Sequence, residues 1–512
     1  MVMTKRKPLS KCCPHLEGRL LTRYSPVRHL VFTEINTPFD LHVLSTKRQL
    51  AYQATEFYAF FHFGMNTYTN REWGDGTEDP EIFNPTEFDA RQWVEAAKSA
   101  GMKGVILTCK HHDGFCLWPT KYTAHSVTAS PWKNGQGDIV RDVADACKEY
   151  GMKFGIYLSP WDRNQPCYGS GKEYNDYYIS QLTELLTGYG DIFSVWLDGA
   201  CGEGPNGKKQ VYDWERYYAC VRKYQPDACI CVCGPDIRWC GNEAGDVRKA
   251  EWSVVPARTA LAESVQEKSQ QADDTEFRQR KITSDMEDLG SREVLKGEND
   301  LIWYPAEVNT SIRPGWFYHK EEDNNVKSLE ELKHIYLGSA GGNATFLLNI
   351  PPMPNGLLHE NDVNRLREFG EWKQEAFSCN LAKTADVFSK DENPDHPVCN
   401  LLEDTSNTWY QPKEGKIPTE LIFSLPEVRR VGYLVLKEAI QYSQRVEAFQ
   451  VSVKTDENVD WEKIYDGTVI GYQKIIPVFR ENVKEVKILI QDFRVLPLLS
   501  FVGIYQDRGQ SD

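Results

Sequence analysis

FYAFFHFG (57–64) is the stretch that decides the fold, because its apolar residues follow one another without alternation. A strand with one face in water alternates apolar and polar residues, whereas a continuous run indicates a strand buried on both faces, as in a parallel sheet. The same texture returns in six later runs: GVILTCK (104–110), KFGIYLS (153–159), DIFSVWLDG (191–199), ACICVCG (228–234), LIWYPAEV (301–308) and ATFLLNI (344–350).

Longer amphipathic segments with helix signals lie between these runs. They are DARQWVEAAKSAG (89–101), DIVRDVADACKEYG (138–151), EYNDYYISQLTELLTGYG (173–190) and VYDWERYYACVRKY (211–224). The first two begin with a capping Asp and end at Gly. This strand-then-helix order predicts an α/β protein with a (β/α)8-like TIM barrel. The alternative, an open doubly wound sheet, lacks a G-x-G-x-x-G turn after the first strand.

The texture of the chain changes after about residue 378. Short alternating runs such as TELIFSL, RVGYLVLKE, VEAFQVSVK and VKEVKILIQ, separated by polar turns, predict a C-terminal antiparallel β-sandwich. We therefore expect an N-terminal extension (1–45), a catalytic barrel (46–377), closed by a helix at 360–377, and a sandwich (378–512). The polar stretch 253–300 has no clear period, which is typical of an insertion at an active-site rim or of a mobile loop.

Bulk properties exclude several classes of function. A formal net charge of −15 over 512 residues argues against nucleic acid as a partner, because phosphate binding needs clustered cations. No apolar stretch is long enough to span a bilayer, and the first twenty residues lack the apolar core of a secretory signal, so we expect a cytoplasmic protein. The cysteines show no paired zinc spacing, and Cys229, Cys231 and Cys233 alternate as small apolar residues on one strand face.

Functional side chains of a barrel project from the C-terminal ends of its strands and the loops that follow. Two carboxylates, histidines and several aromatic residues fall there, which fits a sugar site, because rings stack on sugar faces and polar groups bind hydroxyls. These candidates are His62, Lys110, His111, His112, Asp113, Tyr157, Trp161, Trp196, Asp198, Trp239, Glu243, Arg313, Trp316 and Asn349.

The residues alone leave the roles of these candidates open. An isolated carboxylate at an apolar strand end is costly to bury, yet a turn-forming Asp-Gly explains Asp198 as well as catalysis does. His62, His111 and His112 could be metal ligands, but adjacent histidines at a strand end point to opposite sides, which is awkward for one ion. Neither a phosphate-binding glycine loop nor a convincing metal set is present, so no cofactor and no metal are expected.

Residues 61–123, from FHFGMNTYTNREWGDG to GFCLWPTKYT, resemble the signature region of glycoside hydrolase family 29, the retaining α-L-fucosidases. KFGIYLSPWDRN (153–164), SVWLDGA (194–200), GPDIRWCGNEAG (234–245) and TFLLNIPP (345–352) resemble segments of that family in the same order. The similarity covers roughly residues 48–360. It implies a β/α barrel with a C-terminal β-sandwich and a fucosylated oligosaccharide or glycoconjugate as the substrate.

The resemblance also implies roles for individual residues. Asp198 corresponds to the nucleophile, and Glu243 of GNEAG (241–245) to the acid/base of the branch that acts on α-1,3- and α-1,4-linked fucose in Lewis-type glycans. Glu251, Glu203 and Glu307 compete for the acid role. Substrate contacts are implied for His62, Glu72, Trp73, His111, His112, Tyr157, Trp196 and Trp316.

The mechanism implied by the resemblance retains the anomeric configuration. Asp198 forms a covalent fucosyl-enzyme, and Glu243 acts first as acid and then as base, with the carboxyl groups about 5–5.5 Å apart. Glu243 should have the higher pKa, raised by Trp239 and by the charge of Asp198. The alternatives are a broader fucosidase acting on α-1,2 or α-1,6 links and a non-catalytic fucose-binding protein. The oligomeric state is left open.

Overall fold

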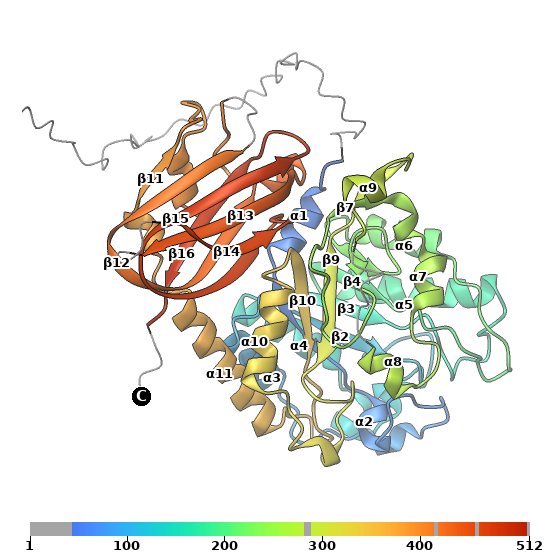
Figure 1. Cartoon of the computed structure of the whole chain (residues 1–512). Coiled ribbons are helices and arrows are strands. Elements are labelled where there is room, and N and C mark those ends of the chain that lie inside the picture. Colours follow the sequence, from blue (N-terminus) through green and yellow to red (C-terminus); the bar gives the residue numbers. More distant parts are fainter. Residues whose placement is uncertain (1–42, 281–287, 414–417, 456–459, 509–512) are drawn as a thin grey trace, which may run out of the picture.

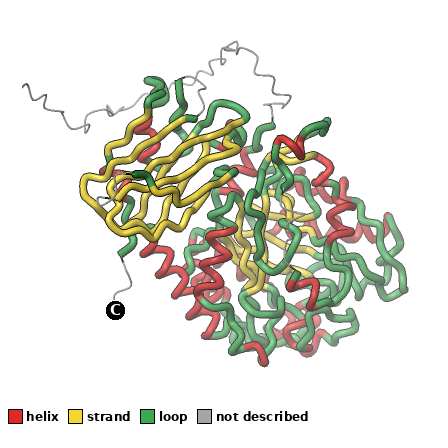
Figure 2. Tube along the Cα trace, in the orientation of Figure 1, coloured by secondary structure: helices red, strands yellow, loops and turns green. Residues whose placement is uncertain are grey.

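The computed structural model describes residues 43–280, 288–413, 418–455 and 460–508. It divides into a barrel with surrounding helices and a smaller domain made mostly of strands (Figures 1 and 2). Eight of the first ten strands form the barrel sheet, and β7 and β8 form a separate pair. All eleven described α-helices belong to this part of the chain, whereas the smaller domain contains the last six strands. The predicted order of an α/β barrel followed by an antiparallel β domain is confirmed.

The barrel is one sheet of eight strands in the order β5-β4-β3-β2-β1-β10-β9-β6, with parallel pairing throughout. A parallel bridge between Cys231 and Ile237 brings its two edges together. Residues of β1 are buried at every position, as continuous apolar runs require. The strands are β1 (Phe57–Phe61), β2 (Gly104–Lys110), β3 (Lys153–Leu158), β4 (Ile192–Leu197), β5 (Cys229–Val232), β6 (Arg238–Trp239), β9 (Ala306–Ser311) and β10 (Ala344–Asn349).

Local signals place the helices that were expected between the strands. Asp89, Asp138 and Asp213 each accept a hydrogen bond from a backbone N–H in the first turn of the helix that follows, and Gly151 ends its helix with φ 67°. The helices are α1 (Lys47–Gln53), α2 (Met65–Thr69), α3 (Ala90–Ser99), α4 (Ile139–Tyr150), α5 (Lys172–Gly188), α6 (Trp214–Tyr224), α7 (Ala262–Lys268), α8 (Thr275–Gln279), α9 (Arg292–Leu295), α10 (Leu329–Gly338) and α11 (Glu360–Ala376).

The prediction that residues 301–308 form a single barrel strand is wrong. Its first part is β8 (Leu301–Trp303), which pairs antiparallel with β7 (Val254–Pro256) outside the barrel, and the barrel strand β9 starts only at Ala306. Pro305 lies between them and has no N–H to donate to a ladder, which separates the two strands. The two-residue β6 takes the sixth position of the barrel and was too short to be recognised from the sequence.

The stretch 253–300 contains short elements in its described part rather than only irregular chain. β7, α7, α8 and α9 all lie within it, and residues 281–287 fall outside the described residues. Ser269 and Gln270, between α7 and α8, border the pocket described below. The insertion therefore contributes to the rim of the barrel mouth, which is the first of the two expectations stated for it.

The C-terminal domain is an antiparallel sheet that folds over on itself. TELIFSL and RVGYLVLKE were expected as two strands, but they form the single twenty-residue β12, which pairs with the equally long β15 through several register shifts. Leu421 and Leu436, from the two halves of β12, belong to one buried core, so the halves form two facing layers. The strands are β11 (Asp386–Ser389), β12 (Thr419–Glu438), β13 (Val446–Thr455), β14 (Glu462–Gly467), β15 (Lys474–Phe493) and β16 (Leu499–Gln506).

The sandwich packs directly on the barrel. Tyr433, Val435, Ile475 and Phe501 of the sandwich join the core cluster of the barrel. The hydroxyl of Tyr472 also donates to Glu56 Oε1 at 2.7 Å. This apolar contact joins the sandwich to the barrel, next to α10 and α11 (Figure 1).

Two global properties follow from the described residues. The twelve cysteines that the structure describes are free thiols, most of them buried. Within the same ranges, no helix has the length and apolarity needed to cross a bilayer.

Candidate active site

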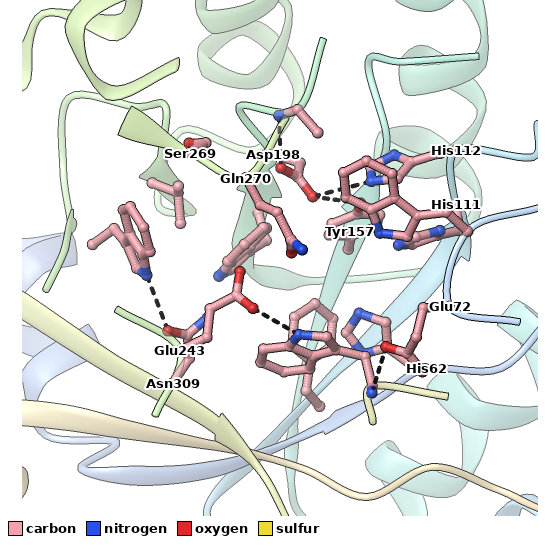
Figure 3. Close-up of a pocket in the computed structure, with 17 residues that line it drawn as sticks. His62, Glu72, His111, His112, Tyr157, Asp198, Glu243, Ser269, Gln270 and Asn309 are labelled. Carbon is pink, nitrogen blue, oxygen red and sulfur yellow. Dashed lines mark hydrogen bonds and ion pairs between the residues drawn. The ribbon is translucent and has the colours of Figure 1, made fainter. Parts of the chain in front are cut away.

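One pocket opens at the C-terminal mouth of the barrel, and the ten residues to which the family resemblance gives a role all line it (Figure 3). His62 follows β1, His111 and His112 follow β2, and Asp198 follows β4, so the parallel strands bring these distant residues to one end. The full lining is Phe60, His62, Glu72, Trp73, His111, His112, Tyr157, Trp196, Asp198, Ala200, Val232, Trp239, Glu243, Ser269, Gln270, Asn309 and Trp316.

Asp198 is held in a fixed orientation by hydrogen-bond donors. Tyr157 donates its hydroxyl to Oδ2 at 2.7 Å, and the backbone N–H of Ala200 donates to Oδ1 at 2.9 Å. Burial in the pocket raises the pKa of Asp198, and these donors oppose the rise because they stabilise the anion. The result is a desolvated carboxylate with a defined direction, as a nucleophile requires.

Glu243 lies across the pocket in a different environment. Burial, with a smaller contribution from the charge of Asp198, raises the pKa of Glu243 to about 7. The indole Nε1 of Trp316 donates to its Oε2 at 2.9 Å. Asn242 Oδ1 accepts from the backbone N–H groups of Ala244 and Asp246, which shapes the loop that presents Glu243. A carboxyl group with a pKa near 7 can both donate and accept a proton at neutral pH.

The tautomer of His62 follows from its neighbours. Asn349 donates through Nδ2 to Ser311 Oγ at 2.9 Å and to the Trp316 carbonyl at 2.7 Å, so its Oδ1 is the atom that faces His62. That oxygen lies 2.8 Å from His62 Nδ1, which must therefore carry the proton. Burial lowers the pKa of His62 to about 4, and the neutral ring keeps a lone pair on Nε2.

His112 has the same tautomer for a similar reason. Ser159 donates its hydroxyl to the Trp161 carbonyl at 2.7 Å, so it accepts from His112 Nδ1 at 2.8 Å. The Nε2 lone pair of His112 then lies 3.8 Å from Asp198 Oδ2. Burial lowers the pKa of His112 well below its usual range, which makes the ring neutral. A hydroxyl group bound here can donate to Nε2.

His111 has the opposite tautomer. Asn66 Nδ2 donates to the Glu72 carbonyl and lies 3.3 Å from His111 Nδ1, which is therefore the acceptor and leaves the proton on Nε2. Burial lowers the pKa of His111 well below its usual range too. Three neutral histidines with a mixed set of donors and acceptors suit neutral hydroxyl groups. Among the described residues, no three His, Cys, Asp or Glu side chains are arranged to hold a metal ion.

The other candidates divide between the pocket wall and its support. Trp73 packs edge-on against His112, with ring centroids 5.0 Å apart, and Trp316 stacks obliquely on His62 at 5.1 Å. Glu72 borders the pocket, but its carboxylate accepts from the backbone N–H groups of Trp316 and Phe317. Glu72 thus supports the Trp316 loop as well as facing the pocket.

The three competitors for the acid role lie elsewhere. Glu251 is buried between Arg238 and Arg248, which lower its pKa. Glu203 is exposed in an isolated β-bridge with Lys209 and does not line the pocket. Glu307 lies inside the barrel and accepts from the indole of Trp196 at 2.7 Å. Of the four glutamates, Glu243 alone lines the pocket.

Two of the shortlisted residues have a structural role in the described contacts. Arg313 is buried and pairs with Asp362 of α11 at 2.9 Å and with Asp323 at 3.0 Å, so it anchors the loop after β9. Lys110 is buried and pairs with Asp162 at 2.9 Å. A position at the end of a barrel strand therefore makes a residue a candidate for the site. The contacts of its side chain then show whether it lines the pocket or holds a loop in place.

Several pocket residues were missed from the sequence. Asn309 lies within β9 and accepts from Trp239 Nε1 at 3.0 Å. Ser269 and Gln270 come from the insertion, where no period guides interpretation. Asn309 had a usable signal, because a buried amide within an apolar barrel strand needs a partner. Ser269 and Gln270 had none.

A pair of carboxylates facing one barrel pocket, one fixed by two hydrogen-bond donors and one with a pKa near 7, is the arrangement that cleaves glycosidic bonds. Fold and site together define the class as a β/α-barrel glycoside hydrolase.

Comparison with known proteins identifies the family. A family model described as alpha-L-fucosidase matches residues 45–376. Alpha-L-fucosidase 1 of Arabidopsis thaliana is 39% identical over 480 residues, which cover 92% of this chain and 89% of the plant protein. A glycoside hydrolase 29 family structure from a rumen bacterium is 36% identical, with a TM-score of 0.75, and the match covers 92% of this chain and 78% of that one. A GH29 fucosidase from Ruminococcus gnavus, solved with fucose, is 29% identical, with a TM-score of 0.78 and coverage of 91% and 95%. The chain therefore belongs to the α-L-fucosidase family, glycoside hydrolase family 29.

Proposed function

We propose that this protein is a retaining exo-α-L-fucosidase that removes α-1,3- and α-1,4-linked fucose from Lewis-type glycans. The observation that carries the proposal is the contrast between Asp198, whose two oxygens accept hydrogen bonds that favour its anion, and Glu243, whose pKa is about 7. Retaining cleavage needs one permanently ionised carboxylate and one that exchanges a proton.

In the first step, Asp198 Oδ2 or Oδ1 attacks the anomeric carbon and the bond to the leaving oxygen breaks. Glu243 gives its proton to that oxygen, so the aglycone departs as an alcohol and the fucosyl group is esterified to Asp198. In the second step, Glu243, now a carboxylate, takes a proton from water, and the hydroxide oxygen displaces Asp198. A separation of about 5–5.5 Å between the carboxyl groups is the spacing that this route needs.

The binding groups support a fucose ring. His62, His111 and His112 offer both lone pairs and N–H groups to hydroxyls, while Trp196 and Trp316 present ring faces to the apolar side of the sugar. Glu72, Trp73 and Tyr157 complete the contacts proposed from the family resemblance. The linkage preference rests on the GNEAG segment (241–245), which resembles that of the α-1,3/1,4 branch.

The test compares fucose release from a Lewis-type trisaccharide, from 2′-fucosyllactose and from 4-nitrophenyl fucoside by the wild type, Asp198→Ala and Glu243→Ala. We expect release mainly from the trisaccharide, α-fucose as the first anomer seen by NMR, and loss of at least about 100-fold in both variants on the trisaccharide. Preferred release from 2′-fucosyllactose would overturn the linkage proposal, and first formation of β-fucose would overturn retention.

A further inference from the structure

His319 lies three residues after Trp316 and places both ring nitrogens against oxygen atoms. Its Nδ1 is 2.7 Å from Asn70 Oδ1, and its Nε2 is 2.7 Å from Glu72 Oε1. A neutral imidazole has one N–H and can satisfy only one of two acceptors, whereas an imidazolium satisfies both. The side chain of His319 is 14% exposed and that of Glu72 is 8% exposed, so water does not readily replace this partner, whereas Asn70 is exposed.

Glu72 connects His319 to the backbone of the Trp316 loop. Its Oε2 accepts from Trp316 N at 2.8 Å, and its Oε1 accepts from Phe317 N at 3.1 Å as well as facing His319. Only an ionised carboxylate accepts at both oxygens from this number of donors without placing a proton against one of them. The pairing with His319 contributes to a lowered pKa of Glu72, although burial opposes it.

Trp316 links the Glu72–His319 pair to the proposed acid/base, Glu243. Its indole donates to Glu243 Oε2 at 2.9 Å, and its carbonyl accepts from Asn349 at 2.7 Å. The contacts are tight at Gly315, where a Cβ atom would lie 2.7 Å from Glu72 Oε1 and 2.8 Å from His319 Cδ2. A glycine is therefore needed for the loop to approach the pair.

We propose that His319 is a positioning residue for the acid/base: as an imidazolium paired with Glu72, it fixes the Trp316 loop so that the indole directs Glu243 toward the leaving oxygen. The inference rests on the proposed function of Glu243. The other charges near the pair are Glu321 and Glu322 on the same loop and Arg278 of α8, 4.0 Å from Glu72 Oε2. Glu321 and Glu322 raise the pKa of His319, because their negative charges favour the imidazolium.

The first test uses the leaving group as a probe of the acid. A poor leaving group such as a sugar needs protonation by Glu243, whereas 2,4-dinitrophenolate does not. We expect His319→Gln to lower kcat/KM at least about tenfold on the Lewis-type trisaccharide but less than about threefold on 2,4-dinitrophenyl fucoside. His319→Lys keeps a cation beside Glu72 and should recover part of the loss.

His334→Gln is the matched control, because His334 is exposed and lines, together with His319, a groove next to the active-site pocket. It should leave both rates unchanged. An equal loss on both fucosides in His319→Gln would show a general structural role and overturn the inference, as would no loss on either. A wild type inactive on every fucoside, including the dinitrophenyl one, would instead overturn the proposed function.

A second measurement needs no activity. In ¹⁵N-histidine-labelled protein, both ring nitrogens of His319 should be protonated at pH 7, with the signal assigned by its loss in His319→Gln. A neutral ring at pH 6 would overturn the inference even in an inactive preparation.

Discussion

The hydroxyl of Tyr157 lies 2.7 Å from Oδ2 of Asp198; Tyr157 belongs to β3, and Asp198 directly follows the adjacent strand β4. A strand pair thus delivers the nucleophile together with a donor that stabilises its anion. The barrel thus has two opposite effects on the pKa of Asp198: burial raises it, and the hydrogen bond from Tyr157 lowers it.

Removing this donor should shift the pH dependence of the enzyme. In Tyr157→Phe, Asp198 loses a hydrogen bond to its charged form, so its pKa rises further. Because catalysis needs ionised Asp198, the acid limb of kcat/KM should move to higher pH by about one unit, with a loss of about tenfold or more at neutral pH. Tyr189→Phe removes a similar bond, to the helix cap Asp138, and should leave the profile unchanged. An unmoved acid limb in Tyr157→Phe would contradict this account.

The alkaline limb should report Glu243. Its pKa is about 7, and the first step needs its protonated form, so kcat/KM on a Lewis-type glycan should fall as pH rises through about 7. The limb should be absent from Glu243→Gln acting on 2,4-dinitrophenyl fucoside, which needs no acid. Rates measured from pH 5 to 9 check this. A limb that persists in the variant would assign the ionisation to another group.

Glu243 should also destabilise the fold at neutral and higher pH. Its folded-state pKa is raised from 4.5 to about 7, so the carboxylate form is disfavoured in the folded protein, and stability is lost as pH rises from about 4.5 through about 7. After allowance for partial exposure, Glu243→Gln should gain on the order of 1–2 kcal/mol in unfolding free energy at pH 8 and nothing at pH 4. Urea denaturation at both pH values measures this difference. Equal gains at the two pH values would show that charge is not the cause.

Glu307 should matter for the barrel interior rather than for proton transfer. It accepts from the hydroxyls of Tyr52 and Tyr58 and from the indole of Trp196. In Glu307→Gln, one of the two oxygens becomes an N–H₂ group that faces either the tyrosine hydroxyls or the indole, so we expect a loss of about 2–4 kcal/mol in unfolding free energy and reduced activity through a displaced Trp196. Glu203→Gln, at an exposed position outside the pocket, is the control and should change neither quantity. Unchanged stability in Glu307→Gln would mean that the three donors find other acceptors.

The sequence alone determined the class of fold and ten of the residues that gather in the pocket. Continuous apolar runs such as 104–110 encode strands buried on both faces, and caps such as Asp138 and Gly151 encode helix ends, because these properties depend on neighbours along the chain. Long ordered segments shared with a family pointed to the ten pocket residues. The break at Pro305 also had a local signal, but the unbroken course of β12 did not, because it depends on pairing with β15.

The tertiary structure decided how those residues are connected. Barrel closure brings Glu72 to His319 across 247 positions of sequence, sets the tautomers of three histidines and removes Glu251 and Glu307 from the list of possible acids. Such properties arise from which groups meet in space, and the pKa of Glu243 depends on the burial that only the assembled pocket creates. Sequence patterns record local preference, whereas proton positions are set by contacts between distant segments.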